Sequence, residues 1–321
     1  MQNVTKREST IGFIEAIGCQ LIWGFMAIFW KLVSAQPTMY CLAYRMVWAG
    51  VFIILLGVFV KKIKFLPLLK DKRALAVFTA TGLISGVNWA LYIWAASSGH
   101  LLETSIGYYL SPLCTILLGL VFFKERMTPG QTVAVIMALT GVSLFIFLNG
   151  AAIWISLLLA GTFSFYGAVK KNSGYEALPG MMIESVITGI IGAILLGLGT
   201  MIPAIWGIIP PSNDPIAVHN EYILTFLLIF SGVLTAVPLL LYSSAVTKIK
   251  FIIVGFLEYI SPSMELAFAV FLFGESFTLA HGLCLGLVWG GIIIASIETA
   301  LGLRRLKKLA NKQSDNLTAN H

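Results

Sequence analysis

The sequence LYIWAASSGHLLETSIGYYLSPLCTILLGLVFFKE, residues 91–125, decides the fold, because much of it returns 150 positions later. Residues 241–275 read LYSSAVTKIKFIIVGFLEYISPSMELAFAVFLFGE, with eight identities at that fixed offset. The two copies share a Tyr-x-Ser-Pro core, at Tyr109–Pro112 and Tyr259–Pro262. Such a recurrence indicates a duplicated half. Because both copies lie in long apolar runs, the pattern predicts a transporter built from repeats.

The composition assigns most of the chain to the membrane. Of the 321 residues, 58% are hydrophobic and 11% are charged, whereas a soluble domain is about 25% charged. A spanning helix needs roughly 20 mostly apolar residues. We therefore predict an all-α polytopic membrane protein with ten transmembrane helices, near residues 11–31, 38–60, 74–96, 101–122, 131–148, 151–169, 180–199, 221–246, 251–273 and 278–300.

The basic residues predict the orientation of these helices. If the ten spans alternate in direction, all of the 21 Lys and Arg except Lys31 and Arg45 fall on one side. Positive charge collects on the cytoplasmic side of membrane proteins, so we expect a cell-membrane protein with both termini in the cytoplasm. A net charge of +7 placed in this way does not indicate nucleic acid as a partner.

Ten spans in two halves give five helices for each half, and an odd number makes the halves face opposite ways. The sequence thus predicts two inverted five-helix repeats, at residues 11–148 and 151–300. Residues 301–321 form a basic and polar cytoplasmic tail, in which we expect no regular structure after Arg304.

Three prolines lie inside predicted spans and are candidate hinges: Pro112, Pro238 and Pro262. A proline removes a backbone donor and frees the carbonyl four residues earlier. A freed carbonyl at membrane depth is tolerated only against protein or a wet cavity. The prolines therefore indicate a central substrate site or hinges beside it, with simple helix packing as the alternative.

Acidic residues in the ninth span form a stripe with Ser261 and Pro262. Glu258 and Glu265 follow the helical spacing of that stripe, and Tyr108, Ser111, Pro112 and Thr115 form the matching stripe in the fourth span. Charge inside a membrane is costly and marks functional interiors. We expect these acids either to carry a coupling proton or to meet a cationic substrate. The alternative is an acid hydrogen-bonded within a helix pair.

Arg45 lies seven residues into the second span, roughly 10 Å deep at 1.5 Å per residue. Glu103 enters the fourth span from the same side and is the opposite-charge candidate for Arg45, with Lys31 at the outer rim as the rival partner. The three residues are candidates for an outer gate or charge pair, or for snorkelling side chains. Glu15 and Glu184, by contrast, are interpreted as acids at the starts of helices, where the positive end of the helix dipole stabilises them.

Other patterns limit the function. Gly282, Gly286 and Gly290 allow close helix packing, either in a homodimer or within the chain. The four cysteines have neither metal nor redox spacing. The sequence has no Walker A loop, H-E-x-x-H motif or G-x-S-x-G motif. We therefore expect no enzyme, no cofactor and no metal site.

The residues that carry a family resemblance lie mainly in the third, fourth, eighth and ninth spans. The chain resembles the drug/metabolite transporter superfamily with EamA-type repeats, and within it the RarD-like group labelled chloramphenicol-sensitive proteins. The resemblance covers roughly residues 12–300 and rests on Trp23-Gly24, Arg45, Asn88-Trp89, Tyr92 to Ala95, Gly99-His100, Gly107 to Tyr109, Pro112, Thr235 to Leu239, Gly255 to Leu257, Tyr259-Ile260, Pro262 and Gly274-Glu275.

The resemblance implies a cytoplasmic-membrane permease that exports metabolites or drugs by alternating access. Three residues of the chain depart from the group's pattern. Ser111 stands where the group has Asn, Glu258 stands where it has Gln, and Glu265 is unusual. Because these departures fall on the proposed cavity stripe, the substrate is not carried over from the family.

The sequence as a whole predicts a secondary transporter of small organic metabolites or drugs. A lipid-linked flippase of the same fold and a non-transporting membrane sensor are the alternatives. The candidate substrate-binding residues are Asn88, Trp89, Tyr92, Tyr108, Tyr109, Ser111, Tyr259, Glu258 and Glu265.

Overall fold

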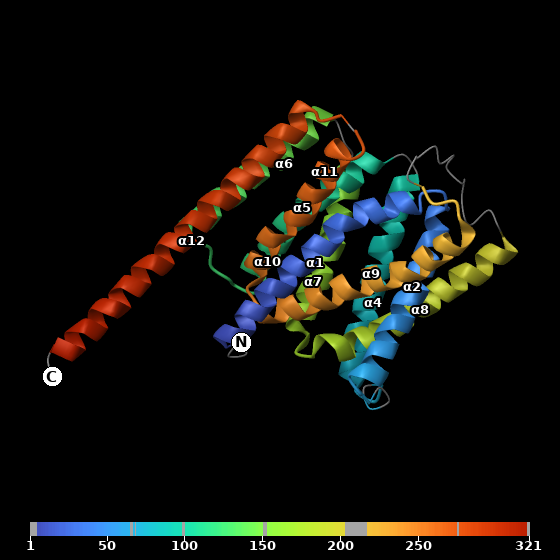
Figure 1. The fold of residues 1–321 in the computed structure, drawn as a ribbon, viewed down its shortest axis with the longest axis horizontal. Coiled ribbons are helices and arrows are strands. Elements are labelled where there is room, and N and C mark those ends of the chain that lie inside the picture. Colours follow the sequence, from blue (N-terminus) through green and yellow to red (C-terminus); the bar gives the residue numbers. More distant parts are fainter. Residues whose placement is uncertain are drawn as a thin grey trace. The chain divides into compact units, whose positions relative to one another are not determined.

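A computed structural model describes residues 5–64, 67, 69–97, 100–149, 153–202, 217–274 and 276–319. The described part is helical (Figure 1). In chain order its elements are α1 (Lys6–Leu32), α2 (Thr38–Leu55), the π-helical turn η1 (Leu56–Val60), α4 (Lys72–Ser97), α5 (Leu101–Val121), α6 (Pro129–Asn149), α7 (Ile153–Ser173), α8 (Ala177–Met201), α9 (Glu221–Lys248), α10 (Phe251–Glu258), α11 (Ile260–Phe271) and α12 (Leu279–Ala319).

Ten stretches of the described chain are helical, long and apolar enough to cross a membrane. Each coincides with one of the predicted spans, so the predicted all-α polytopic fold is confirmed. Element η1 continues α2 in the second span, Thr38–Val60, and α10 with α11 makes up the ninth, Phe251–Phe271.

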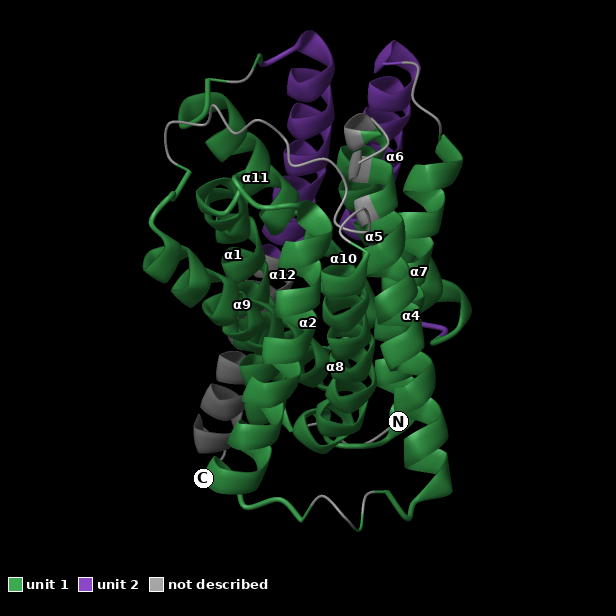
Figure 2. Cartoon of the chain, turned by 90° about the vertical axis from the view of Figure 1, so that its right-hand side faces the viewer, with its two compact units in different colours: residues 1–123, 152–276 green, residues 124–151, 277–321 purple. Residues whose placement is uncertain are grey.

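The chain forms two compact units, coloured green and purple in Figure 2. The first contains α1 to α5 and α7 to α11, and the second contains α6 and α12. The units therefore do not follow the predicted repeats, each of which gives its last helix to the second unit. The repeat boundaries, 11–148 and 151–300, were derived from sequence recurrence and stay a prediction.

The second unit is held by close helix packing and by one carboxylate. Gly291 of α12 packs against the backbone of Ala134 on α6. The Glu298 side chain accepts hydrogen bonds from the Thr128 hydroxyl at 2.5 Å and from the Gly130 amide at 2.9 Å. This carboxylate satisfies backbone and side-chain donors at the start of α6, where a helix leaves its first amides without partners.

In the first unit the main neighbours of each helix form matching sets. Helix α1 packs against α9 and α11, while α7 packs against α4 and α5. Helix α2 packs against α8 and α9, while α8 packs against α2 and α4. Between the two predicted halves α1 corresponds to α7, α2 to α8, α4 to α9, and α5 to α10 with α11. Replacing each helix by its counterpart turns the neighbours of α1 into those of α7, and the neighbours of α2 into those of α8.

The three prolines have different effects on their helices. Pro112 lies inside the continuous helix α5, and Pro238 lies inside the continuous helix α9. The ninth span is instead interrupted at Tyr259, between α10 and α11. This break lies beside Glu258, whose carbonyl would have paired with the amide that Pro262 lacks.

The expected absence of regular structure after Arg304 is wrong, because α12 continues to Ala319. Residues 304–313 read RRLKKLANKQ, rich in residues with high helix propensity, and the stretch from 304 to 319 has neither Gly nor Pro. The prediction gave weight to polarity, whereas local propensity favours continuation of a helix that has already formed.

Candidate substrate cavity

The first unit contains a cavity of about 540 Å³. Its walls come from α1, α2, α4, α5, α7, α9, α10 and α11, and at one end it reaches Ser34 and Gln36 in the connection between α1 and α2. Pockets of this volume hold drug-sized molecules. The cavity is therefore large enough for a small organic substrate.

Most of the predicted substrate-binding residues line this cavity. Seven of the nine do so: Asn88, Trp89, Tyr92, Tyr108, Ser111, Glu258 and Glu265. Tyr109 and Tyr259 are buried elsewhere, and the Tyr109 hydroxyl donates to the Pro262 carbonyl at 3.3 Å. Tyr109 thus links α5 to the repeat-related helix α11.

Asn88 is fixed by α7. Its side-chain amide donates to the Leu159 carbonyl at 2.9 Å and to the Thr162 hydroxyl at 2.7 Å. Both amide hydrogens are therefore used within the protein, so the side-chain carbonyl oxygen is the atom that a substrate can meet.

Glu258 ends α10 at the cavity wall and is 5% exposed. The Tyr242 hydroxyl donates to its Oε1 at 3.1 Å, and Thr115 Oγ1 lies 3.0 Å from its Oε2. Thr115 Oγ1 also lies 3.1 Å from Ser164 Oγ, and the Ser164 hydroxyl donates to the Ser111 carbonyl at 3.1 Å. One acid thus joins hydroxyl groups from α5, α7 and α9.

Glu265 reaches the cavity from α11 and accepts a hydrogen bond from the Ser261 hydroxyl at 3.1 Å. The rings of Tyr92 and Tyr108 also line the cavity, with centroids 6.0 Å apart. Both tyrosines line the same cavity as Glu265 and Arg45. The cavity wall therefore carries an acid on α11, a base on α2 and aromatic rings on α4 and α5.

Arg45 lies among aromatic rings. Its guanidinium carbon is 4.5 Å from the centroid of the Trp89 ring and 5.6 Å from that of the Trp30 ring. A cation is attracted to the face of an aromatic ring. Among the residues described, Arg45 lines the cavity but Glu103 and Lys31 do not.

The other two gate candidates have different neighbours. Glu103 lies 3.4 Å from His100, and the Lys31 amine lies 4.9 Å from the Phe273 ring centroid. A gate made of Arg45, Glu103 and Lys31 stays a prediction.

The glycines proposed for a homodimer face have mixed surroundings. A side chain at Gly290 would meet Met137 of α6, and one at Gly282 would meet Phe277. One at Gly286 would meet no described atom within 4 Å. Gly290 therefore serves packing within the second unit, and the homodimer stays a prediction.

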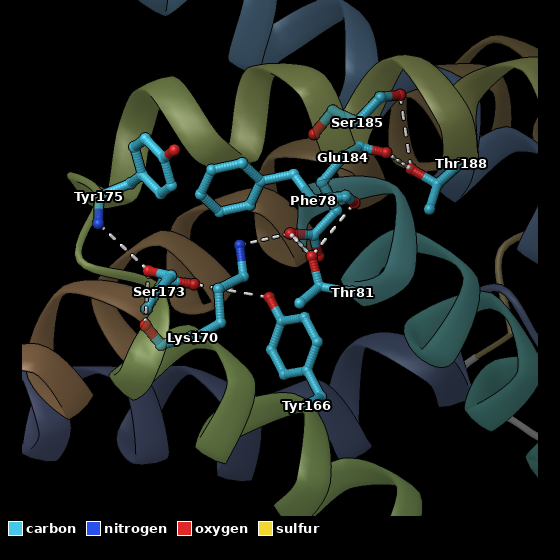
Figure 3. Close-up of polar contacts among 10 residues, drawn as sticks. Phe78, Thr81, Tyr166, Lys170, Ser173, Tyr175, Glu184, Ser185 and Thr188 are labelled. Atoms are coloured by element: carbon cyan, nitrogen blue, oxygen red, sulfur yellow. Dashed lines mark hydrogen bonds and ion pairs between the residues drawn. The ribbon is translucent and has the colours of Figure 1, made fainter. Parts of the chain in front are cut away.

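The sequence reasoning missed a buried ion pair. Glu184 was interpreted as a dipole-stabilising acid, but it lies eight residues into α8, is 5% exposed and pairs with Lys170 of α7. Figure 3 shows the Lys170 amine and the Thr81 hydroxyl pointing at the Glu184 carboxylate. The available signal was a lysine in the last turn of an apolar helix, because such a charge needs a partner when it is buried.

Comparisons with known proteins agree with this architecture. The family model of EamA-like transporters matches residues 10–147. The uncharacterized transporter YojE of Bacillus subtilis is 33% identical over 294 residues, covering 89% of this chain and 94% of its own. Protein RarD of Escherichia coli is 30% identical over 303 residues, covering 94% and 99%. The chloramphenicol-sensitive protein RarD of Pseudomonas aeruginosa is 26% identical over 304 residues, covering 93% and 98%.

A solved crystal structure shares the fold, with a TM-score of 0.65 at 16% identity, covering 91% of this chain and 98% of the other. At that identity the likeness speaks for the fold alone. The identity to YojE extends over nearly the whole of both chains. The chain is thus a multi-pass membrane protein that belongs to the EamA-like transporter family, a family of transporters rather than enzymes.

Proposed function

We propose that this protein is a secondary transporter that exports small organic metabolites or drug-like molecules by alternating access. The observation that carries the proposal is the cavity of about 540 Å³, because it reaches Ser34 and Gln36 at one end, whereas its lining stops at Phe163 on α7 and Leu239 on α9 toward the other. A cavity open at one end is what one state of an alternating-access cycle requires.

Two inverted halves would supply the second state. The matching neighbour sets support this proposal, since α1 with α9 corresponds to α7 with α4, and α2 with α9 corresponds to α8 with α4. Exchanging the conformations of the two halves would then close one end of the cavity and open the other. The distribution of Lys and Arg supports placing both termini in the cytoplasm.

Hydroxyl hydrogens support Glu258 as the site of a coupling proton. Ser164 gives its hydroxyl hydrogen to the Ser111 carbonyl, so its contact with Thr115 requires that Thr115 donate. Thr115 has one hydroxyl hydrogen. Its contact with Glu258 Oε2 is then a full hydrogen bond only if Glu258 carries a proton there. Loss of that proton would turn Thr115 toward the acid and weaken its bond to Ser164.

The test is transport in proteoliposomes with a labelled metabolite pool, with and without a pH gradient. Chloramphenicol belongs in the pool because the name of one relative refers to it. We expect the gradient to drive accumulation, Glu258→Gln to abolish accumulation while exchange continues, and Glu15→Gln to behave like the parent. Glu15 is the matched control, because it is an acid paired with Lys248 away from the cavity.

The opposite results are equally informative. Movement that ignores the gradient and survives Glu258→Gln would assign Glu258 a structural role and make the protein an exchanger or facilitator. If nothing in a broad pool moves, the small-molecule proposal is overturned in favour of a lipid-linked flippase, which a labelled-lipid assay would then detect.

A further inference from the structure

A buried ion pair, Lys170 with Glu184, lies beyond the end of the cavity that is away from Ser34 and Gln36. Phe163 on α7 and Asn88 on α4 line the cavity, and Lys170 and Thr81 lie seven residues away on the same helices. Seven residues are two helical turns, roughly 10 Å. The end of α9 lies beside the N-terminal half of α1, where Lys248 pairs with Glu15, and beside the end of α7, where Lys171 bonds the Val246 carbonyl. Ser34 and Gln36 follow the other end of α1. The step from the cavity to Lys170 and Thr81 therefore leads away from Ser34 and Gln36.

The pair joins three helices at this end. The Lys170 amine of α7 contacts Oε2 of Glu184 on α8, and the Thr81 hydroxyl of α4 lies 3.2 Å from the same oxygen and 3.2 Å from the Phe78 carbonyl. The Lys170 and Glu184 side chains are only 3% and 6% exposed. The Lys170 amine also lies 5.0 Å from the Phe78 ring centroid and 5.3 Å from that of Tyr166 (Figure 3).

A thin layer separates the pair from the cavity. A small void of about 10 Å³ is lined by Ser85, Tyr166 and four residues of the cavity wall, Asn88, Trp89, Phe163 and Leu239. Tyr166 therefore both lines the void and lies beside the Lys170 amine. If α4, α7 and α8 separated at the pair, the cavity would be continuous with the end of the molecule where α7 ends.

We infer that Lys170 and Glu184, with Thr81, form a latch that closes this end of the cavity and separates each time this end opens. The inference rests on the proposed alternating access and adds the residues that hold one of its closed ends. A buried ion pair stabilises a static structure little, since desolvation offsets the attraction, and apolar residues of similar size often do as well. A pair that enters water on opening regains hydration, so the closed and open states remain close in free energy.

The neighbouring lysine has a different partner. The Lys171 amine donates to the Val246 and Ile249 carbonyls at 3.0 and 2.6 Å, where cations suit the end of helix α9. Lys171 therefore fixes α7 to α9, while Lys170 fixes it to α4 and α8. Opening at the latch would break the second set of contacts and leave the first in place.

Thiol labelling tests the latch without any substrate. The reporter is Ser85→Cys, because Ser85 is 6% exposed and lines the small void. The four native cysteines are replaced by alanine. A membrane-impermeant maleimide is added to one face of sealed vesicles at a time, and every variant is first shown to elute as a single species.

We expect slow labelling of the reporter from the face where α7 ends. Lys170→Met and Glu184→Gln should each raise that rate by about tenfold or more, because each removes half of the closed-state contact. Exchanging the charges, Lys170→Glu with Glu184→Lys, should restore slow labelling. Glu15→Gln should leave the rate unchanged, since it breaks another ion pair at the same end, between α1 and α9.

Equal rates in the folded single variants, or a charge-exchange variant labelled as fast as they are, would overturn the latch. Thr81→Val covers the case in which the single variants do not fold. It keeps both charges and removes the hydroxyl that Glu184 shares with the Phe78 carbonyl, and it should raise labelling by about threefold. An unchanged rate in that variant also counts against the latch. Absence of transport would overturn the proposed function and leave these rates to decide the latch separately.

Discussion

At the scale of single residues, Asn88 has two roles, because it lines the cavity and fixes α7. Asn88→Leu keeps the volume but removes both hydrogen bonds, leaving the Leu159 carbonyl and the Thr162 hydroxyl without this donor. We expect a loss of about 1–3 kcal/mol in the free energy of unfolding. Thermal unfolding in detergent would measure it. Thr140→Val is the control, because its hydroxyl is exposed and bonds only within its own turn, and it should change little.

Asp71 connects the start of α4 to the turn between α7 and α8. Its carboxylate accepts from the Ala74 amide at 3.1 Å and from the Tyr175 hydroxyl at 2.8 Å. These bonds, led by the one from Ala74, hold the pKa of Asp71 below its usual range. Stability from a carboxyl with a lowered pKa is present above the ordinary value of about 3.9 and is lost as the pH falls through the lowered one.

We therefore expect Asp71→Asn to lower the melting temperature at pH 7 and to make no difference at pH values below the lowered pKa of Asp71. Melting curves of parent and variant across this range would show the convergence. Tyr175→Phe should reproduce part of the effect at pH 7, because it leaves the bond from Ala74 in place. A constant difference at all pH values would assign the effect to something other than ionisation.

The sequence predicted residues with unusual chemistry better than residues with unusual partners. Glu258 stood out as an acid at membrane depth, Asn88 stood out among the residues that carry the family resemblance, and both lie at the cavity. Lys170 and Glu184 looked like ordinary charges near helix ends. Their pairing depends on how α7 and α8 lie side by side, and helix periodicity does not carry that information.

At the scale of elements, α2 and α9 approach each other closely at Gly232. A methyl group there would lie 2.5 Å from the Ala49 amide nitrogen and against the backbone of Trp48. Backbone atoms cannot move aside without displacing a helix. We expect Gly232→Ala to cost about 1–3 kcal/mol in the free energy of unfolding, measured in detergent.

Gly161 provides the matched control for this substitution. A methyl group on Gly161 of α7 would meet nothing described within 4 Å. Gly161→Ala should therefore leave stability unchanged or raise it by about 0.5–1 kcal/mol, because alanine suits a helix interior better than glycine. Equal destabilisation by both variants would mean that the substitution acts through the helix backbone rather than through packing.

Element boundaries depended on local signals of differing strength. Long apolar runs located every span within a few residues. Three prolines looked alike in the sequence, yet in the described chain only the helix that contains Pro262 is interrupted. Neighbouring helices decide whether a proline-containing helix stays continuous. The extent of α12 was missed because polarity does not itself end a helix.

At the scale of the whole molecule, the charge distribution predicts the topology. Fusions of a periplasm-dependent and a cytoplasm-dependent reporter to each terminus should report both termini in the cytoplasm. Neutralising the six basic residues between 61 and 73, where the chain has Lys61, Lys62, Lys64, Lys70, Lys72 and Arg73, should give a mixed orientation, because these charges hold that connection inside. A uniform reporter pattern in that variant would mean that the remaining basic residues suffice.

The two lysines at the end of α7 restrict how that helix can move. Successive residues on a helix point about 100° apart, so Lys170 and Lys171 hold α7 at two points around its circumference. Such a helix cannot spin about its axis, because turning would strain both attachments together. Once the Lys170 contact is released, α7 is still carried by α9, and the two should swing as a single lever. A spin-label distance from α7 to α9 would then stay constant through the cycle, while the distance from α7 to α8 would take two values.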